Sequence, residues 1–366
     1  MLIKALKVKE LLPIVLGVAI IVMLLVFPAP CIAAAKDGLS LSLSVVFPSL
    51  FPFMVASRYI IATGGAERLA PYFRPVMKGL FRLPPASGIA FVLGVISGYP
   101  VGASAVADLV KNGQISKEQG EHMLAFCNNS GPLFIIGSVA VGMLSSPVYG
   151  YILYGIHFIS AILTGILMRA SAPSYSGTRA KPRPYQDSVS AFTNAVTTSV
   201  YSMLSIIGYI VFFAVVIKIL NILPLFGFVS SWFHINADLV HAFFSGILEM
   251  TNGISSLSFI PVNSNLKMAL IAALIGFSGL CVLFQTKDAV KEAGLSLRKY
   301  VKGKVLLAGI SFVLAYLVFS FLPETVSVFH STVSTVHTNP PFALYFWCSF
   351  IPSIVILILA RNKYSR

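Results

Sequence analysis

Apolar runs long enough to cross a membrane dominate this chain, and glycine and proline interrupt several of them. A membrane-spanning helix needs about 20 consecutive apolar residues. Six runs reach that length without interruption: 11–28, 38–63, 147–168, 189–220, 304–322 and 341–360. Two more runs, 117–144 and 267–286, are long enough to cross but are interrupted. Two others, 86–112 and 238–264, are split into halves that are each too short to cross alone. The pattern predicts an all-α polytopic membrane protein with about eight crossings and two re-entrant hairpins.

Composition and charge placement exclude a soluble protein and a nucleic-acid-binding one. Only 10% of the residues are charged and 57% are hydrophobic, whereas about a quarter of a soluble domain is charged. The net charge of +14 comes from short loops between apolar runs, which is the positive-inside pattern. The four cysteines lack metal-ligand spacing, and no catalytic motif is present. We therefore expect no enzyme activity, no metal site and no cofactor.

The distribution of lysine and arginine predicts the orientation. With the N-terminus inside, 23 of the 26 fall on the inner side, and only Lys36, Lys218 and Lys267 fall outside. Lys304 is counted with the inner loop, so we expect no fixed cation near the midplane. Both termini are then inside. The first helix is expected to be retained, although "KALKVKE" and the apolar run after it resemble a secretory signal whose cleavage stays open.

Four of the six Ser-Gly dipeptides in the chain mark the interruptions, in two pairs with the same internal spacing, which coincidence could also produce. Ser97-Gly98 and Ser130-Gly131 are 33 residues apart, and adding 148 gives Ser245-Gly246 and Ser278-Gly279. Each half would run span, hairpin, broken crossing, span, with opposite orientation in the membrane. Inverted repeats with interrupted helices in matching positions are typical of secondary transporters. The alternative is that these glycines and prolines are ordinary kinks.

These repeats define the expected organisation of the chain. The segments are an N-terminal helix, a first repeat, a cytoplasmic basic linker, a second repeat, and a C-terminal external loop with a final helix: 1–37, 38–169, 170–186, 187–322 and 323–366.

The interruptions are the expected binding site. Irregular backbone at membrane depth persists only where protein buries it or where it lines a wet cavity. The half-helix starts near Pro100, Pro132, Asn252 and Leu280 favour an anionic or carboxylate-bearing ligand. Exposed helix C-termini would attract cations, so the sign of the site stays open. The candidate substrate-binding residues are Ser97, Gly98, Tyr99, Pro100, Gly102, Asn128, Asn129, Ser130, Gly131, Glu249, Thr251, Asn252, Ser278 and Gly279.

A few further polar residues carry expectations of their own. Glu249 is an intramembrane carboxylate, so it is the candidate for coupling to H⁺ or Na⁺, with capping of broken backbone as the alternative. Asp108 is expected to pair locally with Lys111. Asn129 and Ser130 are helix N-cap types, and His157 is expected to be a packing histidine.

Four stretches resemble a known family. "FPSLFPFMV", "GVISGYPVGA", "FCNNSGPLFIIGSVAVG" and "GILEMTNGI" are similar to the sporulation integral membrane protein family YlbJ or SpoVV, over roughly residues 40–320. That family carries nucleoside-recognition Gate segments. The resemblance implies a bacterial membrane protein of sporulation, in the mother-cell-derived outer forespore membrane. It also implies movement of dipicolinic acid, a small flat dicarboxylate.

These observations together favour a secondary transporter or facilitator of a small organic anion, working by alternating access. The alternatives are a transporter of nucleosides or other solutes with the same architecture, and a non-transporting membrane scaffold. The expected partners are the organic anion and the lipid bilayer, with no nucleic acid, and a homo-oligomer is left open.

Overall fold

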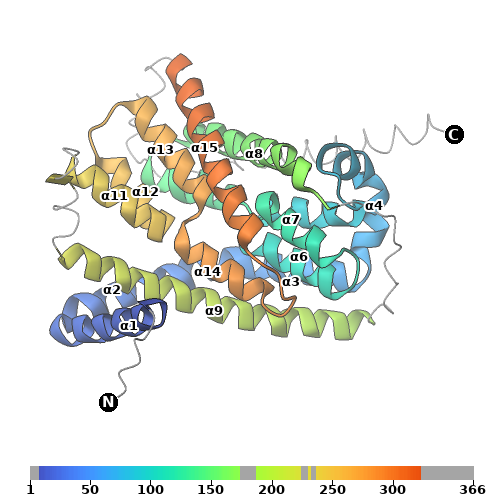
Figure 1. The fold of residues 1–366 in the computed structure, drawn as a ribbon, viewed down its shortest axis with the longest axis horizontal. Coiled ribbons are helices and arrows are strands. Elements are labelled where there is room, and N and C mark those ends of the chain that lie inside the picture. Colours follow the sequence, from blue (N-terminus) through green and yellow to red (C-terminus); the bar gives the residue numbers. More distant parts are fainter. Residues whose placement is uncertain (1–7, 174–186, 224–229, 232–235, 323–366) are drawn as a thin grey trace, which may run out of the picture. The chain divides into compact units, whose positions relative to one another are not determined.

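The computed structural model describes residues 8–173, 187–223, 230–231 and 236–322, and this part of the chain is helices and loops without a strand (Figure 1). The predicted all-α class is confirmed. The predicted crossing 341–360 and residues 174–186 of the linker lie outside the described residues.

The first helices depart from the predicted boundaries. Helix α1 (Val8–Val26) is followed by α2 (Pro28–Leu41), which continues through the π-helical η1 (Ser42–Val46) into α3 (Phe47–Ala62). Helix therefore begins at Pro28 and not near residue 38, because proline is favoured in the first turn, where its missing N–H costs nothing. The α1 and α2 segments meet at an angle of 106°.

The region between the predicted runs 38–63 and 86–112 is helical. It holds α4 (Gly65–Val76), η2 (Met77–Phe81) and η3 (Pro85–Ser87). The first hairpin follows as α5 (Gly88–Ser97) and α6 (Val101–Lys111). Its interruption lies where the sequence predicts it.

The first broken crossing and the helix after it are also as predicted. Helix α7 (Lys117–Cys127) starts with a Ser116–Gln119 capping box and ends before Asn128. The chain resumes as a π-type helix, η4 (Leu133–Met143). Helix α8 (Pro147–Met168) and the short η5 (Arg169–Ser171) complete the half.

The second half repeats this order of elements. A long α9 is followed by a hairpin, a broken crossing and a last helix: α9 (Ser188–Ile222), α11 (Ala237–Leu248), α12 (Met250–Phe259), α13 (Ser264–Phe277), α14 (Gly279–Val290) and α15 (Arg298–Phe321). Helix α15 begins six residues before the predicted run 304–322, which places Lys304 inside the helix.

Several helices have the length and hydropathy that a membrane crossing requires. Four described helical segments are long and apolar enough to cross a bilayer, or up to six if each of two bent pairs counts as one span. The helical, membrane-embedded class is therefore supported, while the predicted eight crossings are not confirmed.

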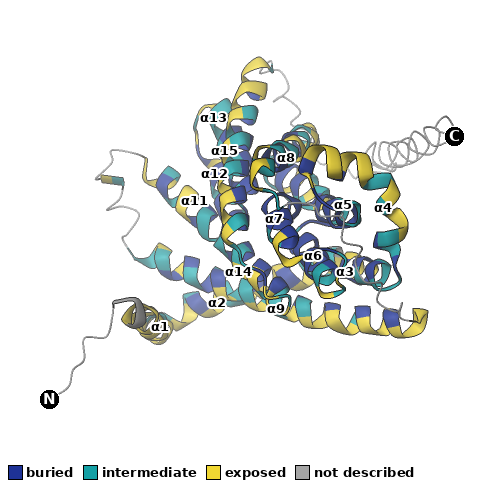
Figure 2. Ribbon diagram, turned by 45° about the vertical axis from the view of Figure 1, so that its right-hand side comes forward, coloured by how far each residue is buried: buried dark blue, intermediate teal, exposed yellow. Residues whose placement is uncertain are grey.

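Packing of the two halves places the interruptions in the interior. Helices α3 and α9 cover the start of α6 through a cluster of Met54, Val101, Met203 and Ile206. Helix α15 lies along α13 and also contacts α7 and α8. In Figure 2, α5, α6 and α7 are mostly buried, whereas α1 and α9 carry long exposed stretches.

Candidate functional site

In the first half, the hairpin tip packs backbone to backbone against the broken crossing. A Cβ built on Gly131 would lie 3.1 Å from the Gly98 nitrogen and 3.1 Å from the Ser97 carbonyl oxygen. Gly98 itself has φ +87°, a conformation that glycine adopts freely. The Ser-Gly dipeptides at 97 and 130 therefore meet in space.

The second half makes the same contact with its own residues. A Cβ on Gly279 would lie 3.2 Å from the carbonyl oxygens of Gly246 and Leu248 and from the nitrogen of Met250. The hairpin tip between α11 and α12 thus rests on the break between α13 and α14. The predicted position of this interruption was wrong, because Ser245-Gly246 lies inside α11 and the break is at Glu249.

Tyr99 joins the two tips. Its hydroxyl group, on the first tip, donates to the Met250 sulfur on the second at 2.5 Å. Four of the predicted segments therefore come together: residues 97–102, 128–131, 249–250 and 278–279. We call these four segments the tip cluster. Thr251 and Asn252 lie next to the tip cluster and donate hydrogen bonds to the Glu249 carboxylate.

A buried polar network joins the first break to the second half. The Asn128 side chain donates to the Thr286 hydroxyl at 2.9 Å and accepts from the Ala103 N–H at 3.3 Å. The Thr286 oxygen lies 3.4 Å from the Tyr300 hydroxyl. Within the described part of the chain, Ser97 Oγ, Asn129 Oδ1 and Ser278 Oγ are buried with no hydrogen-bond partner. Such groups are left to bind water or solute.

The expectation of no fixed cation near the midplane overlooked Lys304, a basic residue that is buried beside the first break. This lysine is only 2% exposed, and its ammonium group donates to the Asn128 carbonyl oxygen at 2.5 Å. The charge count missed it because Lys304 follows the exposed basic residues that begin α15. One signal was present: Tyr300, Gly303, Leu307, Ser311 and Ala315 form a buried stripe of helical period that includes Lys304.

Asn129 and Ser130 differ from their expected N-cap role. His157 is buried, as expected of a packing histidine, and its Nε2 accepts a hydrogen bond from the Ser130 N–H at 3.1 Å. Asn129 and Ser130 do not cap η4: Pro132 occupies the N-cap position without a side-chain hydrogen bond. Asn129 Nδ2 donates back to the Phe126 carbonyl instead.

Glu249 caps the second half of its hairpin. Its carboxylate accepts from the Thr251 and Asn252 backbone N–H groups, each at 3.0 Å, and from the Asn252 side chain at 2.9 Å. A carboxylate at a helix N-terminus is stabilised by the free N–H groups and the helix dipole. The capping alternative is therefore observed, and coupling stays a prediction.

A cavity of about 320 Å³ leads away from the tip cluster. It lies between α6, α9 and α14, with Pro100 and Ser104 at one end and Lys111 and Glu292 at the other. We call this cavity the vestibule. Its charged lining residues form three ion pairs: Arg58–Asp108, Lys111–Glu292 and Lys291–Asp288. The charges of the wall are therefore balanced.

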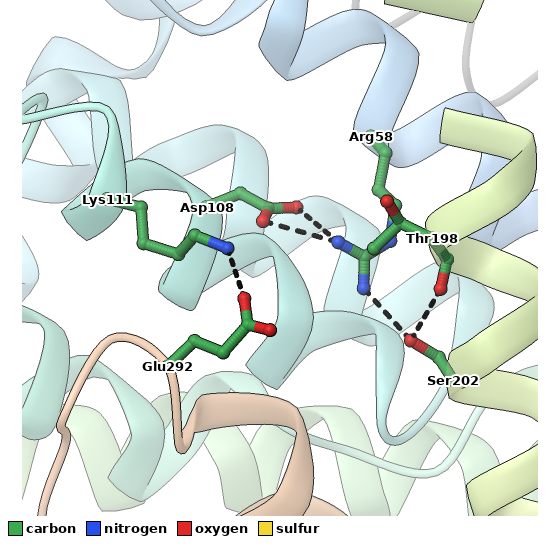
Figure 3. Close-up of polar contacts among 6 residues, drawn as sticks. All are labelled: Arg58, Asp108, Lys111, Thr198, Ser202 and Glu292. Atoms are coloured by element: carbon green, nitrogen blue, oxygen red, sulfur yellow. Dashed lines mark hydrogen bonds and ion pairs between the residues drawn. The ribbon is translucent and has the colours of Figure 1, made fainter. Parts of the chain in front are cut away.

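The ion pairs of the vestibule correct the predicted Asp108–Lys111 pair. Asp108 accepts from Arg58 on α3 at 3.2 and 3.3 Å, and Arg58 also donates to the Ser202 hydroxyl on α9 (Figure 3). Lys111 instead donates to Glu292, beyond the end of α14, at 2.6 Å. Figure 3 shows these two pairs, which link α6 to α3 and to the segment after α14.

The Lys111–Glu292 pair predicts a small pH dependence of stability. The hydrogen bond from Lys111 and its charge lower the pKa of Glu292. A carboxylate whose folded-state pKa is lowered stabilises the fold above its unfolded pKa of about 4.3 and stops doing so as pH falls through the lowered value. Both side chains are well exposed, so we expect Lys111→Ala to cost less than about 1 kcal/mol at pH 7.

Thermal unfolding of both proteins at a series of pH values checks this prediction. The difference in melting temperature between wild type and Lys111→Ala should shrink as the pH falls below about 4. A difference that is the same at every pH would contradict it.

The comparisons with known proteins agree with this geometry. Residues 43–144 match the family model Gate, described as nucleoside recognition. That range contains the first hairpin and the first broken crossing. No solved structure matches the chain.

A curated relative covers most of the chain. The sporulation integral membrane protein YlbJ of Bacillus subtilis (strain 168) is 29% identical over 306 residues, covering 76% of this chain and 75% of that protein. The resemblance predicted from the motifs is confirmed. The chain is a membrane protein that matches the Gate model at residues 43–144 and is similar to the sporulation protein YlbJ over most of its length.

Proposed function

We propose that this protein is a secondary transporter or facilitator for a small organic anion, with dipicolinate as the candidate substrate. The observation that carries the proposal is the vestibule, which is lined by Pro100 of the tip cluster. Its volume of about 320 Å³ is at the lower end for ligand pockets, which run from about 300 to 1,000 Å³. A single-ring solute suits that size.

Contacts between the halves support alternating access between inverted repeats. In the first half, the second arm of the hairpin, α6, packs on α14 of the second half. In the second half the equivalent arm, α12, packs on η4 of the first. Such exchanged contacts allow one half to rock against the other around a shared site. The relative's name says sporulation and integral membrane protein, and the resemblance of the motifs alone favours the outer forespore membrane as the location.

A nucleoside is the second candidate substrate, because the matching family model is described as nucleoside recognition. The two candidates differ in charge. A nucleoside needs hydrogen bonds and stacking, whereas dipicolinate needs compensation of two carboxylates.

Uptake into proteoliposomes tests the proposal. Labelled dipicolinate and labelled uridine are offered separately to the purified full chain, with and without a pH gradient. We expect protein-dependent uptake of dipicolinate and none of uridine. Uptake of uridine alone would favour the nucleoside reading. Uptake of neither, by folded protein, would contradict the proposal and favour a scaffold.

The same assay tests whether Glu249 couples transport to protons. Asp187→Asn is the matched control for Glu249→Gln, because Asp187 caps α9 through two backbone N–H groups in the same way. We expect Glu249→Gln to remove the stimulation by the pH gradient and Asp187→Asn to keep it. If both variants respond like wild type, Glu249 is a cap only.

A further inference from the structure

Lys304 is a buried lysine without an anionic partner in the described part of the chain. The ion pairs found there are Arg58–Asp108, Lys111–Glu292 and Lys291–Asp288, and none includes it. Burying an ammonium group is costly unless its charge is compensated. Lys304 has one carbonyl oxygen, that of Asn128, and two aromatic rings nearby.

The groups that face Lys304 supply partial compensation only. Its Nζ lies 6.0 Å from the ring centre of Tyr99 and 5.7 Å from that of Tyr300. Cys127 on α7 and His157 on α8 also interact with it electrostatically, but a thiol and an imidazole carry no negative charge at pH 7 under ordinary conditions. Among the described residues, none supplies a full counter-charge to Lys304.

The vestibule reaches the surroundings of Lys304 at two points. Pro100 lines it, and the adjacent Tyr99 presents its ring to the lysine. Gln285 lines it, and the adjacent Thr286 belongs to the network around Asn128. The residues around Lys304 are therefore next in sequence to two residues of the vestibule wall, Pro100 and Gln285.

We propose that Lys304 supplies the positive charge that binds a carboxylate of the transported solute, with the Tyr99 ring beside it for a flat ring to pack on. This inference rests on the proposed function and deepens it by naming the residue that selects the anion. The vestibule wall has balanced charges, so the proposed selection for an anion depends on a charge outside that wall.

A structural role for Lys304 makes different predictions. Asn128 follows the last residue of α7, so Lys304 also faces the negative end of that helix. As a cap alone, the lysine would hold the break in shape for every solute equally. As a binding group, it would discriminate solutes by their charge.

Three probes with the same ring separate these roles: pyridine-2,6-dicarboxylate, pyridine-2-carboxylate and the neutral pyridine-2,6-dicarboxamide. Binding is measured on the purified full chain by equilibrium dialysis. For wild type we expect the dicarboxylate to bind roughly thirtyfold more tightly than the diamide. Lys304→Gln should weaken dicarboxylate binding roughly thirtyfold and leave diamide binding unchanged. Lys302→Gln, an exposed lysine two residues away, should behave like wild type.

Each other outcome has a distinct meaning. Equal wild-type affinity for the dicarboxylate and the diamide overturns the inference without any variant. Loss of all three probes by a folded Lys304→Gln protein overturns it in favour of the cap, and unchanged binding by that variant also overturns it. If wild type binds none of the probes and transports none, the proposed function itself fails.

Discussion

Gly102→Ala should lower the melting temperature and abolish uptake, whereas Gly155→Ala should raise the melting temperature and leave uptake intact. A Cβ on Gly102 would lie 2.6 Å from the Cys127 carbonyl oxygen and 2.8 Å from the Gly94 Cα. These are backbone atoms, so relief requires the hairpin to move away from the break. Overpacking of this kind costs about 1–3 kcal/mol.

Gly155→Ala should change the melting temperature in the opposite direction, because Gly155 lies inside α8 with no atom within 4 Å of the position of an added Cβ. Alanine there removes the cost of a helical glycine, about 0.5–1 kcal/mol. Thermal unfolding in detergent and uptake into proteoliposomes measure both variants. A melting temperature for Gly102→Ala at or above that of wild type would contradict the close packing of hairpin and break.

The second half offers an internal replicate. A Cβ on Gly253 would lie 2.7 Å from the Ala242 carbonyl oxygen and would also clash with the Gly246 backbone. Gly253→Ala should therefore reproduce the loss seen with Gly102→Ala. If only one of the two variants lost uptake, the proposed equivalence of the halves would be wrong.

The interruptions could be predicted from the sequence because glycine and proline inside an apolar run are local signals. The breaks after Ser97, Cys127 and Phe277 depend on the residues at those positions and on little else. The same holds for the cap of α7, where Ser116 and Gln119 are three residues apart. Local chemistry of this kind is visible without knowledge of the fold.

The partners across the fold could not be predicted, because they depend on tertiary packing. Lys304 and Asn128 are 176 residues apart, and Ser130 and His157 are 27 apart on different helices. The positive-inside rule treats every lysine near an apolar run as a loop residue. It cannot distinguish Lys302, which is exposed, from Lys304, which is buried. Helical phase within α15 separates them, and that phase requires the true start of the helix at Arg298.

Breaking the Arg58–Asp108 pair should destabilise the protein far more than breaking the neighbouring Lys111–Glu292 pair. The side chains of Arg58 and Asp108 are 13% and 16% exposed, against 40% and 69% for Lys111 and Glu292. Removal of one partner leaves a nearly buried charge without compensation, which costs about 3 kcal/mol or more. The exposed pair contributes less than about 1 kcal/mol. Arg58→Met should therefore lower the stability of the fold several times more than Lys111→Ala.

The double variant Arg58→Met/Asp108→Asn separates the value of the pair from the cost of an orphaned charge. With both charges gone no uncompensated carboxylate remains, so we expect most of the stability lost in Arg58→Met to return. The thermal unfolding of the four proteins of this cycle measures the coupling. Additive losses would mean that the two side chains do not compensate each other. Arg58 also donates a hydrogen bond to Ser202 on α9. The stability that the double variant does not recover therefore measures the contribution of this contact between α3 and α9 along the vestibule wall.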